Sequence, residues 1–310
     1  MKDIHKDFDI FSRALIVSSD CDPVYPFVKD LIKIKHYEPA WFVFVYVAFY
    51  SLESAIKMCN EFPTSGDWNE KKFLEMRASK YISKFGHERR GTVRNVKNQL
   101  SLFRGVLDFL DVFDNLDSKI GGYELNNKTF RNHLQTYPFH GGWSAYKIAE
   151  LFEKSLGYDE LSIHDLGLQG RDPNRDDSPI GGLRWLYGRE NVYDESFFPI
   201  WNRFGENLAK SWGTGIGEVE TCLCKFHKLC TGKYFVGHDI QEFVELEHVL
   251  GKNTYQIIMK ANYHPVFWTG KKHLEKEKKG IYMKNSKVLY EDFAKKLPKA
   301  NVLNILLNTE

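Results

Sequence analysis

Residues 39–52 read PAWFVFVYVAFYSL, the longest stretch of the chain without Asp, Glu, Lys, Arg or His. A helix formed by this run would be apolar on every side, which is typical of a helix enclosed by protein or by lipid. At this length it is much too short to cross the roughly 30 Å of hydrocarbon in a bilayer. We therefore predict a buried core helix and expect no membrane partner.

The sequence on both sides of this run also has helical periodicity. Residues 23–60 predict two helices, the second being the apolar run, and residues 68–110 predict two more. Residues 255–259 could form a strand, but no alternating pattern is long enough for a sheet. We predict an all-α fold, as a single helical domain over residues 1–310 or as two packed lobes. Further helices are expected at residues 127–134, 143–156, 183–186, 197–212, 217–229, 239–250 and 282–296.

The composition is that of an ordinary soluble protein. Its 43 Lys and Arg residues nearly balance 41 Asp and Glu residues, so any surface for nucleic acid must be a local patch. Five cysteines and a charged N-terminal stretch favour a reducing, cytoplasmic compartment. Residues 265–310 form a charged C-terminal region that includes the run GKKHLEKEKKG.

Residues 137–156, YPFHGGWSAYKIAELFEKSL, follow the short helix expected at 127–134. Two helices joined by a glycine-containing turn are the outline of a helix-hairpin-helix. The backbone N–H groups of such a turn can meet a DNA phosphate, although the turn can also simply join two helices. The candidate DNA contacts in this turn are His140, Gly141 and Gly142.

A basic stretch lies earlier in the chain, within the largely helix-forming segment 68–110. It could lie along a duplex and make binding dependent on salt, or it could be a solvated helix face. Its candidate DNA-binding residues are Arg89, Arg90 and Arg94.

Residues 164–189 concentrate acidic, basic and glycine residues. We expect Gly181 and Gly182 to open a helix, where free backbone N–H groups can meet an anion. Arginines in the same segment can bind phosphate oxygens in pairs, so a phosphate or pyrophosphate site is indicated. The alternative is a solvated loop with internal Asp–Arg pairs, each contributing little. The candidate anion-binding residues are Arg171, Arg184 and Arg189.

Glu220, Cys224, His227 and Lys228 are spaced to share one face of the helix expected at 217–229. A carboxylate, an imidazole and an amine on one face could transfer protons, or could form a polar network without chemistry. The pattern C-x-C-x2-H-x2-C, which begins at Cys222, does not have the spacing of a structural zinc site, and we expect no bound metal.

Three blocks, GGWSAYKIAELF, PIGGLRWLYGR and EVETCLCKFHKL, resemble the alpha-glutamyl/putrescinyl thymine pyrophosphorylase family. These are the amino acid:DNA transferases of phage thymidine hypermodification, and their helical domain also accompanies 5-hydroxymethyluracil DNA kinases. The chain departs from the family pattern where Gly181 replaces an Arg, Lys225 a Glu and Leu229 a Tyr. The likeness covers most of residues 22–250.

The resemblance implies a phage-encoded enzyme, active in the cytoplasm of the infected bacterium. Its substrates would be double-stranded DNA that carries 5-pyrophosphoryloxymethyl-deoxyuridine and a small amine, either an amino acid or a polyamine, which replaces the pyrophosphate. The resemblance also implies kinship with helix-hairpin-helix DNA glycosylases. We expect no cofactor, and participation of a divalent cation stays open.

The implied chemistry distributes roles among the candidate residues. Arginines would stabilise the charge that develops on the departing pyrophosphate. A carboxylate or imidazole would take the proton of the amine, and an aromatic side chain would stack on the extruded base. The catalytic candidates are Asp165, Glu220, His227 and Lys228, and the stacking candidates are Trp143, Tyr146 and Trp185.

Two other functions remain as alternatives. A helical DNA-binding module would recruit other enzymes without catalysis. A helix-hairpin-helix DNA glycosylase would hydrolyse the N-glycosidic bond with Asp165 or Asp172.

Overall fold

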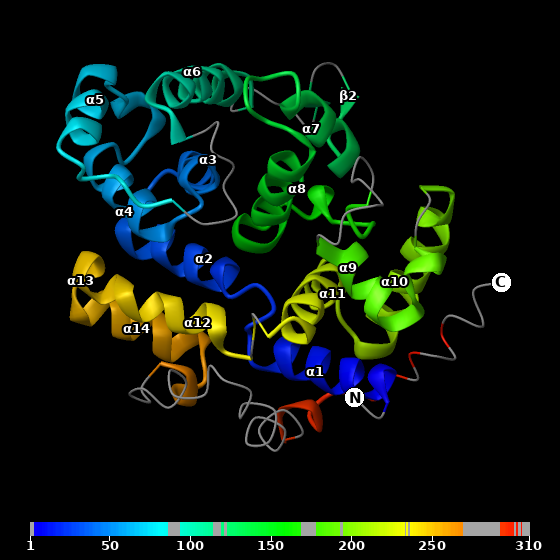
Figure 1. Cartoon of the computed structure of the whole chain (residues 1–310). Helices are drawn as coiled ribbons and strands as arrows, with labels where there is room; N and C mark the ends of the chain where they lie inside the picture. The colour runs from blue at the N-terminus through cyan, green and yellow to red at the C-terminus, as the bar shows by residue number, and fades with distance from the viewer. Residues whose placement is uncertain are drawn as a thin grey trace. The chain divides into compact units, whose positions relative to one another are not determined.

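In the computed structural model, the described part of the chain is helical apart from one antiparallel pair of two-residue strands (Figure 1). The prediction of an all-α fold class is confirmed. The structure describes residues 3–85, 94–113, 119–120, 123–168, 178–192, 195–232, 234, 236–268, 292–300, 302 and 305.

The chain divides into two compact units. The first unit comprises Met1–Pro23, Ile163–Glu245 and Met259–Glu310, and the second comprises Val24–Ser162 and Leu246–Ile258. Each unit therefore combines segments that are far apart in the sequence.

The second unit is built around α3 (Pro39–Phe49), in which every residue from Ala40 to Phe49 is buried. The predicted core helix is confirmed. Its three principal neighbours are α4 (Leu52–Glu61), α6 (Val96–Phe113) and α8 (Gly142–Leu151) (Figure 1).

The ends and the polar atoms of α3 are accommodated locally. Pro39 lies in the first turn, where its missing N–H costs no hydrogen bond. The helix ends at Tyr50, which has a left-handed φ of 49°, and Ser51 then caps α4. The indole N–H of Trp41 donates to the carbonyl of Phe62 at 2.8 Å, so a fully buried donor is satisfied.

The other elements of the second unit are short helices and turns around this core. They are α2 (Val24–Lys35), η1 (Ser65–Asp67), α5 (Glu70–Ala78), β1 (Lys119–Ile120), β2 (Tyr123–Glu124), α7 (Asn127–Leu134), η3 (Phe152–Leu156), η4 (Asp159–Leu161) and α13 (Glu247–Leu250).

Two expectations about individual elements were wrong. The segment expected as a strand at 255–259 is inside α14 (Lys252–Asn262), because its buried residues recur with helical spacing. Residues 23–60 form three helices rather than two, since the chain breaks between α3 and α4. The helix expected at 143–156 is confirmed, as α8 followed directly by a π-helical turn over Phe152–Leu156.

The first unit begins with α1 (Ile4–Val17), which the sequence did not predict. Phe8 and Phe11 of α1 pack on Phe226 of α11 (Ile216–Cys230), with ring centroids 5.0 and 5.9 Å apart. The remaining elements of this unit are α9 (Ser178–Tyr187), η5 (Arg189–Asn191), η6 (Glu195–Phe197), α10 (Phe198–Trp212), α12 (His238–Glu242) and η8 (Pro265–Phe267). The residues of η7 (Phe243–Leu246) and α14 are divided between the two units.

A buried ion pair ties a C-terminal segment to α1. Arg13 Nη2 lies 2.7 Å from Asp9 Oδ2, and Arg13 also donates to the carbonyls of Ala294 and Leu297. The other oxygen of Asp9 accepts from the indole of Trp212, at 3.0 Å. Every charge in this cluster is therefore hydrogen-bonded, as a buried pair requires.

None of the helices in the described ranges combines the length and the apolar character that a membrane crossing requires. The charged run at 270–280 lies outside the described residues.

Candidate anion pocket on the α9–α11 helix pair

Two glycines allow α9 and α11 of the first unit to pack backbone against backbone (Figure 1). A Cβ atom at Gly181 would lie 2.6 Å from Nδ1 of His227, and one at Gly182 would overlap the Leu223 carbonyl. The helix already begins at Ser178, so the expectation that these glycines open it was wrong. Their role is to bring the two helices into close contact.

This packing leaves a pocket of about 260 Å³ at the edge of the helix pair. It brings together two of the predicted anion-binding arginines, one predicted proton-transfer residue and one predicted stacking residue. The lining residues are Gly181, Arg184, Trp185, Arg189, His227 and Thr231.

The cationic groups of the pocket are held by the backbone around them. Arg184 is only 8% exposed, and its Nε–H donates to the carbonyl of Val192 at 3.2 Å. Gly188, with φ of 87°, turns the chain after α9 so that Arg189 returns to the same pocket. Two guanidinium groups and an imidazole in one concavity favour an anion with several oxygen atoms.

Trp185 is 41% exposed although its side chain is large and hydrophobic. It belongs to the lining of the same pocket as the arginines. An exposed indole beside cationic groups can offer a flat surface on which a base stacks.

The residues predicted to share one face of a helix lie on α11. Only part of that face lines the pocket. His227 and Thr231 contribute to the lining, whereas Glu220 is buried about two helical turns earlier. Cys224 lies between them, and its thiol donates to Oε1 of Glu220 at 3.2 Å. Lys228 is half-buried on the same helix and is not among the lining residues described.

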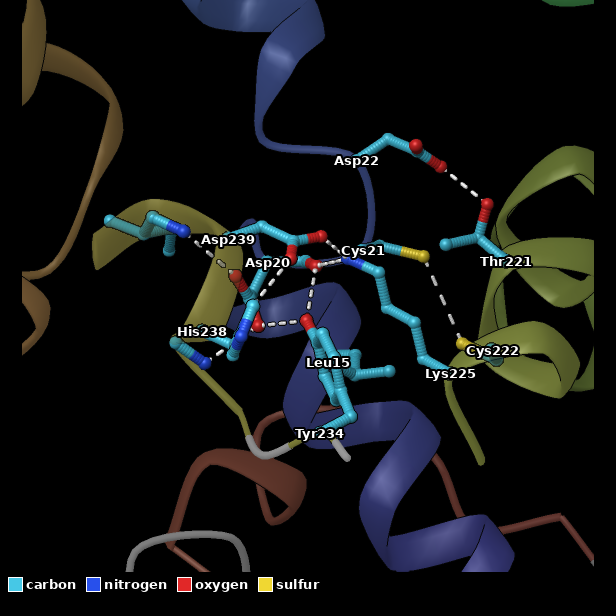
Figure 2. A network of polar contacts seen from close by, with 12 residues as sticks. Leu15, Asp20, Cys21, Asp22, Thr221, Cys222, Lys225, Tyr234, His238 and Asp239 are labelled. Carbon is cyan, nitrogen blue, oxygen red and sulfur yellow. Dashed lines mark hydrogen bonds and ion pairs between the residues drawn. The ribbon is translucent and has the colours of Figure 1, made fainter. Parts of the chain in front are cut away.

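A second polar cluster lies on another face of α11, where Asp20 is completely buried (Figure 2). The Asp20 carboxylate accepts from the Tyr234 hydroxyl at 2.5 Å, from Gly237 N at 2.6 Å and from Ile240 N at 3.3 Å. Asp20 thereby caps the N-terminus of α12 from a distant part of the chain. The ammonium of Lys225 donates to the Asp20 backbone carbonyl.

The charges in this cluster shift one another's titration. Burial raises the pKa of Asp20 to about 6, with Lys225 opposing the shift and Asp239 adding to it. Burial alone would lower the pKa of Lys225, but Asp239, Asp20 and Asp22 hold that pKa above its usual value. Lys225 is therefore a permanent cation, 2.7 Å from Asp239.

Residues 16–235 match the family model of amino acid:DNA transferases. The match includes both helices of the pocket and every residue that lines it. This chain belongs to the amino acid:DNA transferase family. No curated protein and no solved structure matches it. The resemblance drawn from three sequence blocks is confirmed.

In the second unit of this transferase, α7 and α8 flank the predicted glycine turn. Gly141 is the N-cap of α8 without a side-chain cap, and a Cβ at Gly141 or Gly142 would meet none of the described atoms within 4 Å. The backbone here is open to an approaching molecule. His140 is buried, with its ring edge-on to Phe44 at 5.8 Å.

The two stacking candidates that the second unit contributes differ from Trp185 in their surroundings. Tyr146 is buried, and the Arg131 guanidinium lies over its ring at 5.2 Å. Trp143 is half-buried and contacts the ring of Tyr50 at 5.0 Å. Neither side chain offers an open face like that of Trp185.

The other predicted residues are dispersed or outside the described parts. Asp165 accepts from Gly167 N at 2.6 Å and so closes its own turn. Arg94 is exposed in the second unit, with its guanidinium 5.8 Å from the Phe85 ring. Arg171, Asp172, Arg89 and Arg90 lie outside the described residues.

The thiols of α11 point to different partners. Cys222 lies 3.8 Å from Cys21, sulfur to sulfur, while Cys224 contacts Glu220. Within the described ranges, no group of three or more metal-ligating side chains could hold an ion.

Sequence reasoning missed the acidic loop 18–23, SSDCDP, which supplies Asp20 and Asp22 to α11. A signal was present, since two aspartates flank a cysteine directly before a proline. The signal could not be interpreted without α1, because the end of that helix places this loop against α11.

Proposed function

We propose that this transferase attaches an amine to DNA by displacing pyrophosphate from 5-pyrophosphoryloxymethyl-deoxyuridine. In this proposal the α9–α11 pocket binds the pyrophosphate. The observation that carries it is the meeting of Arg184, Arg189 and His227 in one pocket beside the exposed Trp185.

The leaving group explains the cationic lining. As the bond from the methylene carbon to oxygen breaks, its electron pair and a full negative charge pass to the pyrophosphate. Fixed guanidinium groups of Arg184 and Arg189 stabilise that charge without having to reorganise. His227 can donate a hydrogen bond or a proton to the departing oxygen.

The helix α11 also suits the two ends of a displacement. The incoming nitrogen and the leaving oxygen occupy opposite sides of the carbon, about 4–5 Å apart as the reaction begins. With one hydrogen bond of about 3 Å added at each end, the group that takes the amine proton and the group that assists the leaving oxygen lie about 10 Å apart. Glu220 and His227 are seven positions apart on α11, also about 10 Å along the axis. We assign Glu220 to the amine proton and His227 to the leaving group.

The base must leave the duplex to reach a pocket of this kind. Trp185 would stack on the extruded pyrimidine. The open turn between α7 and α8 would contact the DNA backbone, as in a helix-hairpin-helix. The DNA would be that of a phage in the cytoplasm of its bacterial host, and the amine an amino acid or a polyamine.

The test uses a DNA duplex carrying the pyrophosphorylated nucleotide, incubated with the full chain and a mixture of amino acids and polyamines. Mass spectrometry of the digested nucleosides should show an amine adduct, together with release of pyrophosphate. Arg184→Ala and Arg189→Ala should each lower the rate 100-fold or more, on the order expected for losing one charge-stabilising donor. Arg104→Ala, at an exposed ion pair with Glu70, is the matched control and should keep the wild-type rate.

Abasic sites in place of adducts would indicate a glycosylase. Retention of the DNA without any product would indicate a binding module. Either result would overturn the proposed function.

A further inference from the structure

Phe139 lies in the turn between α7 and α8 and differs from the aromatic residues on either side of it. The ring of Tyr137 lies 5.6 Å from that of Phe109, and His140 is buried against Phe44. Phe139 is 37% exposed and takes part in none of the ring contacts in the described part of the chain. The turn therefore anchors its flanks among aromatic rings and leaves one large apolar ring at the surface.

The backbone at Phe139 is left-handed, with φ of 65°. A bulky side chain is strained in this conformation, which glycine adopts freely. Such strain persists only where the surrounding structure holds it. Pro138 supplies part of that hold, because a Cβ atom added at Gly105 of α6 would lie 3.0 Å from Cδ of Pro138. A phenylalanine at a position that suits glycine favours a role for the ring itself.

The surroundings of Phe139 favour a polyanion as its partner. Residues 125–149 contain no Asp or Glu. Within this range Lys128 is exposed and Arg131 is half-buried. The backbone at Gly141 is open, since a Cβ atom there would meet none of the described atoms within 4 Å. In a member of the amino acid:DNA transferase family, a polyanion that approaches this turn is DNA.

We propose that Phe139 is a wedge, whose ring inserts between stacked bases of the duplex and occupies the gap that opens when the modified nucleotide is extruded. This inference rests on the base extrusion in the proposed function and deepens that function. Apolar side chains inserted between base steps unstack them. A ring that fills the gap also offers a face on which the neighbouring base stacks, which offsets part of the cost of extrusion.

The anchored turn gives this role a physical basis. Because the residues on both sides of Phe139 are packed in the second unit, the ring is presented before DNA arrives. Little conformational freedom is then lost on binding, and more of the stacking free energy is available to open the duplex. A single exposed apolar side chain is ordinary on a protein surface. The left-handed backbone and the acid-free segment distinguish Phe139 from such a residue.

The experiment uses the full chain and two forms of the pyrophosphorylated DNA. In the duplex, the fluorescent adenine analogue aminopurine is placed next to the modified nucleotide, because its fluorescence rises when it is unstacked. The second substrate is the same strand without its complement, in which there is little pairing or stacking to disrupt. The fluorescence change on mixing, the single-turnover rate of adduct formation and the Tm of the protein are measured.

Three substitutions at Phe139 separate the ring from the backbone. Phe139→Ala removes the ring, and Phe139→Gly removes the ring and also relieves the strain at φ of 65°. Phe139→Leu keeps an apolar side chain that can act as a wedge. The matched control is Tyr81→Ala, at an exposed aromatic residue of the same unit.

We expect Phe139→Ala and Phe139→Gly to lower the rate on the duplex about 10-fold or more, as the loss of one aromatic–base stack implies. Both variants should lose most of the fluorescence rise and keep the wild-type rate on the single strand. Phe139→Leu should recover the duplex rate to within about 3-fold. Tyr81→Ala should match the wild type on both substrates. The Tm of Phe139→Gly should stay close to that of the wild type, because glycine suits this backbone.

Phe139→Gly with the wild-type duplex rate and fluorescence rise would overturn the wedge and leave the transferase function intact. An equal loss on the duplex and on the single strand would also overturn the wedge, because the ring would then matter without a duplex to open. If Phe139→Ala fails to fold, Phe139→Gly gives the same information.

Absence of any amine adduct with the wild-type chain would overturn the transferase function. The fluorescence rise requires no chemistry, so it tests the wedge separately. A rise that Phe139→Gly abolishes and Phe139→Leu retains would support the wedge even then.

Discussion

Gly182 lies so close to the backbone of Leu223 that the space for a first side-chain carbon is already occupied by the Leu223 carbonyl. A Cβ atom at Gly181, beside it, would lie 2.6 Å from Nδ1 of the His227 imidazole. The close contact between α9 and α11 therefore depends on two positions at which the side chain is a single hydrogen atom. The pocket is formed at this contact, so its shape depends on the same two residues.

Gly182→Ala should destabilise the chain by about 1–3 kcal/mol, since overpacking forces the backbone of α11 to move. Urea unfolding at 25 °C measures the change. Gly142→Ala is the matched control, because an added Cβ there meets none of the described atoms. It should leave the free energy of unfolding unchanged or raise it by up to about 1 kcal/mol. Equal effects of the two substitutions would contradict the packing role of Gly182.

Asp9→Ala should cost about 3–5 kcal/mol, because it leaves Arg13 as a buried charge without its partner. The loss should appear as a lower urea midpoint in equilibrium unfolding. Arg104→Ala breaks a solvent-exposed pair and should leave the urea midpoint close to that of the wild type. A loss below 1 kcal/mol for Asp9→Ala would show that the cluster around α1 contributes little.

Asp20 should make the stability depend on pH in a defined window. Its pKa of about 6 in the folded chain exceeds the ordinary value of about 3.9. The folded state therefore binds this proton more tightly, and the resulting stabilisation is complete below about pH 4 and is lost as the pH rises through 6. In Asp20→Asn this group no longer titrates.

Urea unfolding of both chains between pH 4 and 7 tests this expectation. The free energy of unfolding of the wild type, minus that of Asp20→Asn, should fall by about 2 kcal/mol across the window. A difference that is constant with pH would show that Asp20 is not perturbed.

Trp185→Ala should weaken binding of a strand that carries the modified base by about 1–3 kcal/mol, the contribution of one stacked base. Because Trp185 is exposed, the Tm of the Trp185→Ala variant should stay close to that of the wild type. Trp185→Phe should retain most of the affinity for the modified strand. Fluorescence anisotropy gives the Kd. Tyr81, an aromatic residue of the second unit with the same 41% exposure, supplies the control Tyr81→Ala. An equal loss in the two alanine variants would argue against a specific stacking surface.

Treatment with a chelator such as EDTA should change the transfer rate by less than about 2-fold, since guanidinium groups can supply the charge that a metal would supply. The rate before and after removal of divalent ions, with pyrophosphate release as the readout, measures this. Loss of activity that added Mg²⁺ restores would place a cation among the catalytic groups.

Most of the candidate pocket could be predicted from local sequence. Arg184, Trp185 and Arg189 are close in the chain, and helical spacing places Glu220 and His227 on one face of α11. The roles of Gly181 and Gly182 were not predictable, because an anion site and a close helix contact require the same absence of a side chain. Only the position of Leu223 distinguishes the two.

Sequence periodicity by itself determined the helical class, the buried run at 39–52 and the face shared by Glu220 and His227, since each depends on residues within a few turns of one helix. Tertiary structure alone decided that Asp20 and Asp22, which the chain separates from Thr221 and Lys225 by about two hundred positions, lie against α11. The physical reason is that a polar group can be buried only where partners satisfy it, and those partners need not be neighbours in the sequence.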